Sequence, residues 1–233
     1  MTLHVGESTM PPAVSELLSS PAGPSVRAKP KRAAWEKWLA GIDGAEAGLA
    51  VVPAELDRAE MCRISEKLIA SREIVGAFVV AMVWGYGSSG YGPYRTRAVL
   101  TGHRSPQGRS IEPNVVERLR ESATIAREKG AVEGFRYLNN RNLGRIAYLG
   151  PAFFTKWLYA ATARGVHDSR EAAPVLDARV LGWVNHHTDL HLRPRLTEDY
   201  ARYLAALTVW GTAAEPARTP VAVEEAIFDA TAT

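Results

Sequence analysis

The apolar residues of this chain recur at helical spacing from Trp35 onward, and this pattern limits the fold more than any other feature. Few runs of alternating β-branched residues are long enough to form strands. A chain of 233 residues with 46% hydrophobic content can bury a sizeable core, and no repeat of solenoid length divides it. The sequence therefore predicts a single all-α domain over residues 34–233.

Several segments combine helical spacing with a recognisable helix start. We expect helices over residues 54–70, with Pro53 in the first turn, over 72–84 after a Ser71 cap, and over 113–129. A further helix should begin at a Thr197 cap, and its inward face should carry Tyr200, Tyr203, Leu204, Leu207 and Trp210.

Residues 1–33 differ from the rest of the chain in composition. They are rich in Pro, Ser and Ala, lack periodic apolar positions and end in the basic run RAKPKR at residues 27–32. This composition predicts a disordered basic tail, which is either a solvated leader or an arm that tracks DNA. These residues contain no basic segment followed by an apolar one, so we expect no signal peptide.

Composition also limits the function classes. The single cysteine, Cys62, argues against a disulfide framework or a cysteine-based zinc cluster and fits a reducing cytoplasm. The longest apolar run, residues 74–84, is too short to span a bilayer, so we expect no membrane partner and a cytoplasmic, nucleoid-associated location. The net charge of +3 comes mainly from arginine, which suits phosphate partners, although biased codon usage also enriches arginine.

The segment WGYGSSGYGPYRTR, residues 84–97, contains glycines with the spacing G-x-G-x-x-G. A dinucleotide-binding turn has this spacing but follows a strand and opens a helix, whereas these glycines follow an expected helix. No G-K-[ST] follows, so the segment does not match a phosphate-binding P-loop either. The glycines then serve a sharp turn, and the tyrosines and arginines after them either border a DNA cleft or are simply solvated.

The most informative stretch is IAYLGPAFFTKWLYAATARG, residues 146–165, where a turn at Gly150 opens an apolar helix that Lys156 interrupts. Lys156 either extends its amine from the helix edge to water or is desolvated, which would lower its pKa and provide a neutral nucleophile. Asp177 follows a short apolar segment and precedes a helix, as an N-cap does. A carboxylate at a helix N-terminus stays ionised and can stabilise a positive charge that develops beside it.

These residues resemble the helix-hairpin-helix DNA glycosylases, in particular their 8-oxoguanine DNA glycosylase branch. Members share a hairpin turn, a helix that begins with TK, a loop, and an aspartate at the start of the next helix, which matches residues 143–183 here. The resemblance extends loosely from Trp35 to the C-terminus. It implies an all-α fold with a central cleft for DNA and the extruded base.

By this resemblance, Lys156 is the nucleophile that attacks the deoxyribose C1′, and Asp177 is the carboxylate that stabilises the cationic sugar. An imine at C1′ permits strand nicking by β-elimination. The resemblance therefore implies a bifunctional glycosylase and abasic-site lyase that excises an oxidised purine such as 8-oxoguanine. The implied partner is double-stranded DNA with a damaged or modified base, bound by a monomer without a cofactor or a metal.

Extruding a base from a duplex requires phosphate contacts and stacking surfaces. The candidate DNA contacts are Arg179, Gly150, Arg145, Arg141, Arg95 and Arg97. The candidates for the base pocket are Trp157, Phe153, Trp84 and Tyr91, with Tyr159 as a further stacking group, although aromatic residues of this kind are more often in the core.

The chain departs from the family hairpin L-P-G-x-G, because it has YLGPAFF at residues 148–154. Backbone amides of this turn can still hold a phosphate at the helix N-terminus, but the departure puts a hairpin-bound metal ion in doubt.

Other interpretations remain open. His187 and His191 lie four residues apart, as two metal ligands on one helix would, but no matched carboxylate or cysteine set accompanies them. They can instead stabilise a helix dipole near Pro194, where a helix should end. The main rival function is a non-enzymatic helical DNA-binding module, and a second is a small-molecule enzyme that uses the glycine segment.

Overall fold

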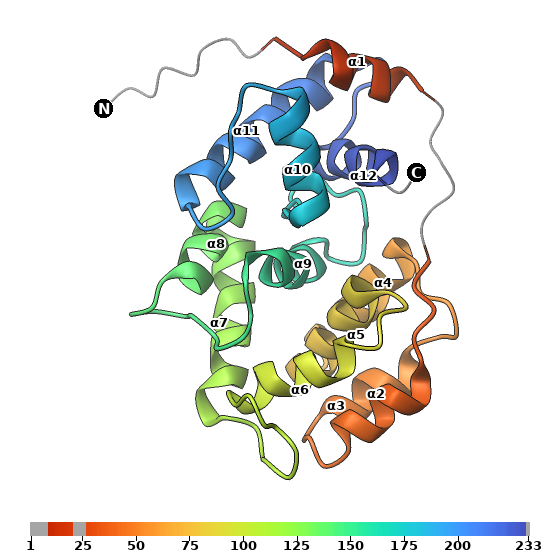
Figure 1. The fold of residues 1–233 in the computed structure, drawn as a ribbon, viewed down its shortest axis with the longest axis vertical. Coiled ribbons are helices and arrows are strands. Elements are labelled where there is room, and N and C mark those ends of the chain that lie inside the picture. The colour runs from red at the N-terminus through yellow and green to blue at the C-terminus, as the bar shows by residue number, and fades with distance from the viewer. Residues whose placement is uncertain (1–8, 21–26, 232–233) are drawn as a thin grey trace.

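The computed structural model of the chain describes residues 9–20 and 27–231, and this part is all-helical (Figure 1). It contains twelve α-helices and no strand, and its one extended pairing is an isolated antiparallel bridge between Ala28 and Leu56. The all-α fold expected from the sequence is confirmed. The helices are α1 (Pro12–Ser19), α2 (Arg32–Leu39), α3 (Ala45–Val51), α4 (Arg58–Ala70), α5 (Ile74–Tyr86), α6 (Gly92–Thr101), α7 (Pro113–Lys129), α8 (Ala131–Asn139), α9 (Pro151–Thr162), α10 (Ala178–His187), α11 (Thr197–Ala213) and α12 (Pro220–Ala230).

Helix α9 lies in the middle of the molecule (Figure 1). The helices α10, α11 and α12 lie on one side of it with α1, and α2 to α6 lie on the other. Helix α9 packs against α4, α5, α7 and α8. This central place suits its sequence, because ten of its twelve residues are buried and all of these except Thr155, Lys156 and Thr162 are apolar or aromatic.

Aromatic side chains join α9 to its neighbours. Trp157 meets Phe78 of α5 edge-to-face with ring centroids 5.8 Å apart, and Phe154 meets Phe135 of α8 at 4.8 Å. Phe135 also stacks on Tyr200 of α11, with centroids 4.4 Å apart. These contacts place the α8, α9 and α11 helices in one continuous core.

Helix α7 spans residues 113–129, as predicted. The predicted starts of the two helices before the glycine segment, α4 and α5, are wrong. Helix α4 begins at Arg58 because Asp57 caps it, accepting a hydrogen bond from the Glu60 N–H at 2.8 Å. Ser71 ends α4 instead of capping the next helix, and α5 begins only at Ile74. Short polar residues suit several positions near a helix end, so their type alone does not say which helix they serve.

The expected face of α11 is largely confirmed, although its start is not. Thr197 is the first residue of α11, and Leu196 is the cap. Tyr200, Tyr203, Leu207 and Trp210 are buried on one face, whereas Leu204 is only partly buried.

The expectation of a disordered tail over residues 1–33 is wrong for part of the described chain. Residues 12–19 form α1, which packs on α12 and buries Val14 and Leu18. The Arg218 guanidinium donates a hydrogen bond to the Leu18 carbonyl at 2.8 Å. The two buried side chains are four residues apart, which is a helical spacing, but two positions are too few to reveal a helix within a polar segment. Residues 1–8 and 21–26 of the expected tail lie outside the described residues.

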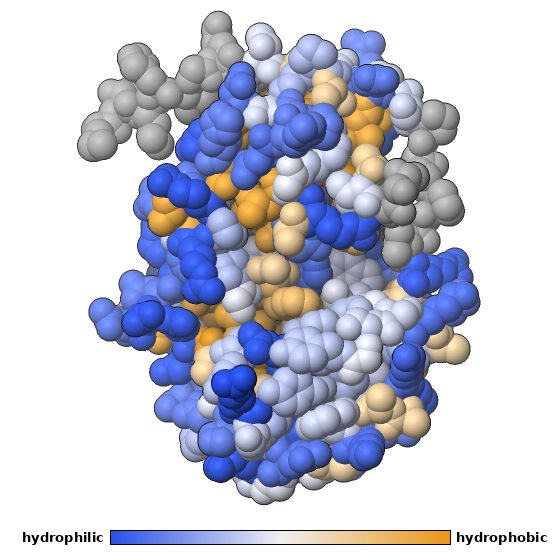
Figure 2. Space-filling model, viewed as in Figure 1, coloured by the Kyte–Doolittle hydropathy of each residue, from blue (hydrophilic) through white to orange (hydrophobic). Residues whose placement is uncertain are grey.

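The surface mixes polar and apolar residues. Figure 2 shows hydrophobic residues exposed across the middle of the face viewed in Figure 1, with hydrophilic residues around them. Leu143 and Tyr148, in the loop between α8 and α9, are among the exposed large hydrophobic side chains. Within the described ranges, no helix combines the length and the apolar composition needed to cross a membrane.

Candidate functional site

Lys156 lies in the middle of α9, and only 6% of it is exposed. Its Nζ donates a hydrogen bond to Oδ2 of Asp177 at 2.7 Å. The rings of Trp84 and Phe153 each have their centroid 5.8 Å from this nitrogen. Of the two interpretations of Lys156, the structure therefore supports the buried one, because the amine lies against a carboxylate and not in bulk water.

Asp177 is the N-cap of α10, as its sequence position predicted. Its Oδ1 accepts hydrogen bonds from the backbone N–H groups of Arg179 at 3.0 Å and Val180 at 3.2 Å. The other oxygen, Oδ2, accepts the bond from Lys156. One carboxylate thus fixes both the start of a helix and the position of the amine.

The segment before Asp177, residues 173–176, is held in place by hydroxyl groups from α9 and α11. Because each of its residues makes one such bond, the start of α10 is fixed relative to α9. The four bonds join the Ala173 N–H to Thr162, the Leu176 N–H to Thr155, the Tyr200 hydroxyl to the Pro174 carbonyl and the Tyr203 hydroxyl to the Val175 carbonyl.

The surroundings of Asp177 favour its ionised form. Burial alone would raise the pKa of the Asp177 carboxyl, but the neighbouring Lys156 ammonium and the N–H groups of Val180 and Arg179 outweigh this effect. They hold the pKa of Asp177 below its ordinary value. Asp177 is therefore ionised at neutral pH and can stabilise a cation nearby.

The pair lies at a cavity of about 300 Å³, which we call the lysine cavity. Six segments line it: residues 27–28, the start of α4, the end of α5, the middle of α9, the start of α10 with the residues before it, and α12. Besides Lys156 and Asp177, its lining includes Trp84, Gly85, Tyr86, Gly87, Ser88, Val175, Arg179, Glu224, Glu225, Phe228 and Asp229. Acidic, basic and aromatic side chains thus converge on one concave site, as in many ligand pockets.

A buried ion pair forms one wall of the lysine cavity. The Arg58 guanidinium binds both carboxylate oxygens of Glu224, with N···O distances of 2.7 and 3.2 Å. It also lies over the rings of Trp84 and Tyr159, 5.2 and 5.0 Å from their centroids. Burial raises the pKa of Glu224, and the charge and hydrogen bonds of Arg58 oppose that rise. The pair joins α4 to α12 next to Lys156.

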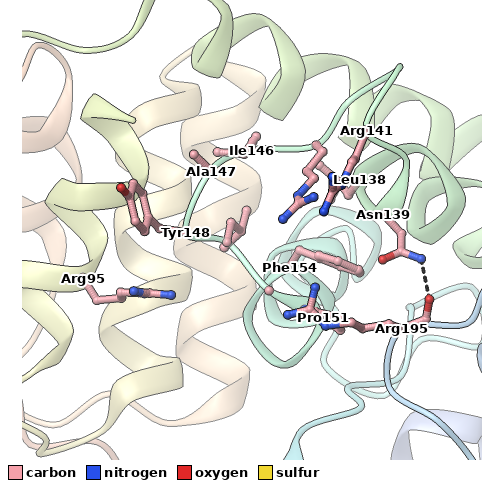
Figure 3. Close-up of a pocket in the computed structure, with 13 residues that line it drawn as sticks. Arg95, Leu138, Asn139, Arg141, Ile146, Ala147, Tyr148, Pro151, Phe154 and Arg195 are labelled. Carbon is pink, nitrogen blue, oxygen red and sulfur yellow. Dashed lines mark hydrogen bonds between the residues drawn. The ribbon is translucent and has the colours of Figure 1, made fainter. Parts of the chain in front are cut away.

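A second, larger cavity of about 580 Å³ surrounds the N-terminus of α9, and we call it the arginine pocket (Figure 3). Four of the lining residues are arginines from three parts of the chain: Arg95 in α6, Arg141 and Arg145 in the loop between α8 and α9, and Arg195 after α10. Figure 3 shows Arg141 and Arg195 on one side of Pro151, with Arg95 and Tyr148 on the other. The Arg95 guanidinium lies 5.4 Å from the centroid of the Tyr148 ring.

Backbone groups add to the positive character of the arginine pocket. Gly150 is at the N-cap position of α9, but it has no side chain that could accept a hydrogen bond from the first N–H groups of the helix. Pro151 follows in the first turn. Among the described residues, no acceptor pairs with the N–H groups of Tyr148, Gly150 or Ala152. Free N–H groups at a helix N-terminus and nearby guanidinium groups together suit a phosphate.

The structure separates the predicted site residues into two sites. Lys156, Asp177, Arg179 and Trp84 line the lysine cavity, and Phe153 lies beside it through its contact with Lys156. Gly150, Arg145, Arg141 and Arg95 line the arginine pocket. Between them, the ring of Phe153 stacks on Tyr86 with centroids 4.0 Å apart.

Four predicted residues belong to neither site. Tyr159 is fully buried, and its hydroxyl donates to the His167 carbonyl at 2.7 Å. Trp157 is fully buried in the core, where its Nε1 donates to Ser122 at 2.9 Å, so it cannot be a pocket wall. Arg97 is only 6% exposed and donates to the backbone carbonyls of Trp38, Ala40, Pro106 and Arg109, so it is a structural residue. Tyr91 is 54% exposed and contacts Tyr94, away from the lysine cavity.

The structure also places Arg179 and the two histidines. Arg179 is exposed and lines the lysine cavity, where its guanidinium lies 4.2 Å from the Phe228 ring centroid and donates to Thr231, and its expected phosphate contact stays a prediction. Helix α10 ends at His187, so His187 and His191 do not share a helix, and His191 has a left-handed φ of 47°. In the described ranges, no group of three or more His, Cys, Asp or Glu side chains could hold a metal ion.

Sequence reasoning missed Arg58, Glu224 and Arg195. Arg58 is in the first turn of a helix, where a solvated arginine is ordinary, and Glu224 lies 166 residues further along the chain. Arg195 follows Pro194 in a loop that gives no local signal of a distant partner. Only the basic pair of arginines around Pro194 could have suggested it.

The described residues thus combine an all-helical fold, a buried lysine against a helix-capping aspartate, and a cationic pocket at the N-terminus of α9, the helix that carries the lysine. Residues 23–228 match the family model described as "Putative 8-oxoguanine DNA glycosylase OGG-like protein". The chain belongs to this family. No curated protein and no solved structure matches the chain. At the coarse level, the family supports a DNA glycosylase acting on DNA.

Proposed function

We propose that this protein excises an oxidised purine from double-stranded DNA through an imine between Lys156 and the deoxyribose, and that it also cleaves the resulting abasic site. The observation that carries the proposal is the 2.7 Å contact between the buried Lys156 Nζ and Asp177 Oδ2 at the lysine cavity. A nucleophilic amine needs a base beside it and a pocket for the reacting sugar, and both are present.

The reaction begins with the pair. Asp177 accepts a proton from the Lys156 ammonium, and the neutral amine attacks C1′ as the bond from C1′ to the base nitrogen breaks. The bonding electrons leave with the base, which takes up the proton that Asp177 accepted. The carboxylate of Asp177 is thereby ionised again and stabilises the positive charge of the amine–sugar adduct.

Strand cleavage follows from the same intermediate. The amine loses a proton, the bond from C1′ to O4′ breaks, and O4′ takes up a proton, which leaves an imine to C1′. Loss of a proton from C2′ then expels the 3′ phosphate by β-elimination. Water hydrolyses the imine and frees Lys156.

The arginine pocket supplies the contact that holds the DNA. We infer that a phosphate binds at the N-terminus of α9, near the guanidinium groups of Arg141, Arg145 and Arg195. Phosphate contacts of this kind fix the register of a duplex without reading its sequence. Because Lys156 lies on the same helix, a phosphate held at its N-terminus places the extruded nucleotide near the lysine cavity.

The test is borohydride trapping with a duplex that contains one 8-oxoguanine. A covalent protein–DNA adduct should form with the wild-type protein and be absent in Lys156→Gln, which should still bind the duplex. The matched control is Lys129→Gln, an exposed lysine at the end of α7, which should give the wild-type adduct.

Two outcomes would contradict the proposal. If no adduct forms across a panel of damaged and modified bases while the duplex is still bound in a salt-dependent manner, the protein is a non-enzymatic DNA-binding module. If Lys156→Gln keeps both base release and trapping, another residue is the nucleophile.

A further inference from the structure

Gly85, in the segment with the spacing G-x-G-x-x-G, lies directly under the side chain of Lys156. It is the penultimate residue of α5 and does not have a left-handed φ. A Cβ on this residue would lie 2.6 Å from Cδ, 3.3 Å from Cε and 3.7 Å from Cγ of Lys156. Three consecutive carbons of the lysine therefore pass over the bare Cα of Gly85.

The backbone itself does not require glycine at this position. A glycine inside a helix destabilises it by about 1 kcal/mol relative to alanine. Gly87, two residues later, is different, because its φ of 56° ends the helix in a conformation that favours glycine. At Gly85, the feature that excludes a side chain is the contact with Lys156.

Lys156 cannot easily move aside, because both of its ends are fixed. Its backbone is part of the buried helix α9, and its Nζ is bonded to Asp177 at 2.7 Å. The rings of Trp84 and Phe153 also lie close to the amine, with each centroid 5.8 Å from Nζ. A Cβ at residue 85 would press on the middle of the chain, so Cδ would have to shift by about 1 Å to reach ordinary contact distance.

We propose that Gly85 is a positioning residue, which sets the path of the Lys156 side chain and thereby holds Nζ at Asp177. The proposal extends the proposed function, in which Lys156 is the nucleophile, but its structural part does not depend on that chemistry. It also gives the glycine segment a role that needs no nucleotide, which is to let α5 approach the reactive lysine closely.

The first experiment separates positioning from binding. Gly85→Ala should lower the single-turnover rate of adduct formation by about 100-fold, because a misplacement of about 1 Å has an effect of this order. The dissociation constant for the same duplex should change by less than about threefold. The matched control is Gly182→Ala in α10, a helical glycine with no neighbouring atom within 4 Å of an added Cβ, and it should leave both quantities unchanged.

The second experiment needs no activity. The melting temperature is measured for the wild-type protein, Gly85→Ala, Lys156→Ala and the double variant. Gly85→Ala should lower the melting temperature by about 3 °C or more when Lys156 is present. In the Lys156→Ala background, the same change should be neutral or stabilising, because alanine favours a helix and the clash is gone.

The outcomes distinguish the two proposals. If the wild-type protein forms no adduct but the melting temperatures of Gly85 and Lys156 variants are coupled, the proposed chemistry fails and the positioning role stands. If adduct formation is normal in the wild-type protein and unchanged in Gly85→Ala, the positioning role is wrong. Equal effects of Gly85→Ala in both backgrounds would also overturn it.

Discussion

The amine of Lys156 has one ionised partner within hydrogen-bond distance, the Asp177 carboxylate, which also caps α10. The two residues act as a unit, because removing either leaves a mostly buried charge with fewer partners. Arg97 illustrates the opposite case at the same scale. Its guanidinium is satisfied by four backbone carbonyls, so its charge is used to hold loops together and is not offered to DNA.

The Asp177–Lys156 pair predicts a defined pH dependence of stability. The pKa of Asp177 is lowered in the folded protein, so the pair stabilises the fold fully above the unfolded-state pKa of about 3.9 and loses this contribution as pH falls through the folded pKa. Asp177→Asn keeps an N-cap but removes the charge, and it should reduce the free energy of unfolding at pH 7 by about 3 kcal/mol.

Chemical denaturation of both proteins from pH 8 to pH 3 checks this prediction. The difference in unfolding free energy between wild type and Asp177→Asn should be constant down to about pH 4 and shrink below it. A difference that already declines between pH 8 and pH 6 would show that another group is responsible.

At the scale of elements, the N-terminus of α9 does two things at once. Its first backbone N–H groups have no acceptor within the described part of the chain, and arginines from α6, the loop between α8 and α9, and the segment after α10 surround them. Six residues into the same helix, Lys156 faces the lysine cavity. One rigid helix therefore sets the distance between the expected phosphate contact and the nucleophile.

The arginine pocket predicts a change in the salt dependence of DNA binding. Arg141→Ala and Arg195→Ala should each weaken duplex binding, and each should reduce the slope of log affinity against log salt by about 1, because one phosphate contact is lost. Binding isotherms at four or more salt concentrations measure this slope. The matched control is Arg120→Ala, an exposed arginine on α7 that pairs with Glu117. A slope that falls equally in the control would mean that only the overall charge matters.

At the scale of the whole molecule, the lysine cavity depends on contacts between segments far apart in the chain. Arg58 and Glu224 join α4 to α12 across 166 residues, and α12 in turn packs against α1, α10 and α11. The C-terminal helix is therefore a wall of the site, although its sequence contains no recognisable motif. The same ion pair lies against Trp84 and Tyr159, which connects the wall to α5 and α9.

This pair predicts a strongly non-additive double substitution. Glu224→Leu alone should reduce the free energy of unfolding by about 3–5 kcal/mol, because it leaves the buried Arg58 charge with only its 3.4 Å contact to Glu225. Replacing both residues, as Arg58→Met with Glu224→Leu, should recover most of that loss, since neither charge is then buried. Denaturant unfolding of the two single variants and the double variant measures the coupling. A double variant as unstable as the sum of the single ones would refute the prediction.

Local signals in the sequence determined much of this protein. Apolar spacing predicted an all-α fold, the turn at Gly150 predicted the start of α9, and the residues before α10 predicted Asp177 as its cap. These features depend on neighbours within one or two helical turns, and such spacing is visible in the sequence. The resemblance carried by Lys156 and Asp177 agrees with the family to which the chain belongs.

Only the tertiary structure decided which side chains meet. Lys156 and Trp157 are adjacent in the sequence, but successive helical residues point about 100° apart, so one faces the cavity and the other the core. Arg95 and Arg97 are the same residue type two positions apart, yet packing buries Arg97 and leaves Arg95 in the arginine pocket. The importance of Gly85 depends on the packing of α9 against α5, because the side chain of Lys156 occupies the space that a Cβ on residue 85 would need. Contacts between distant segments arise from the packing of the whole chain, and no local spacing encodes them.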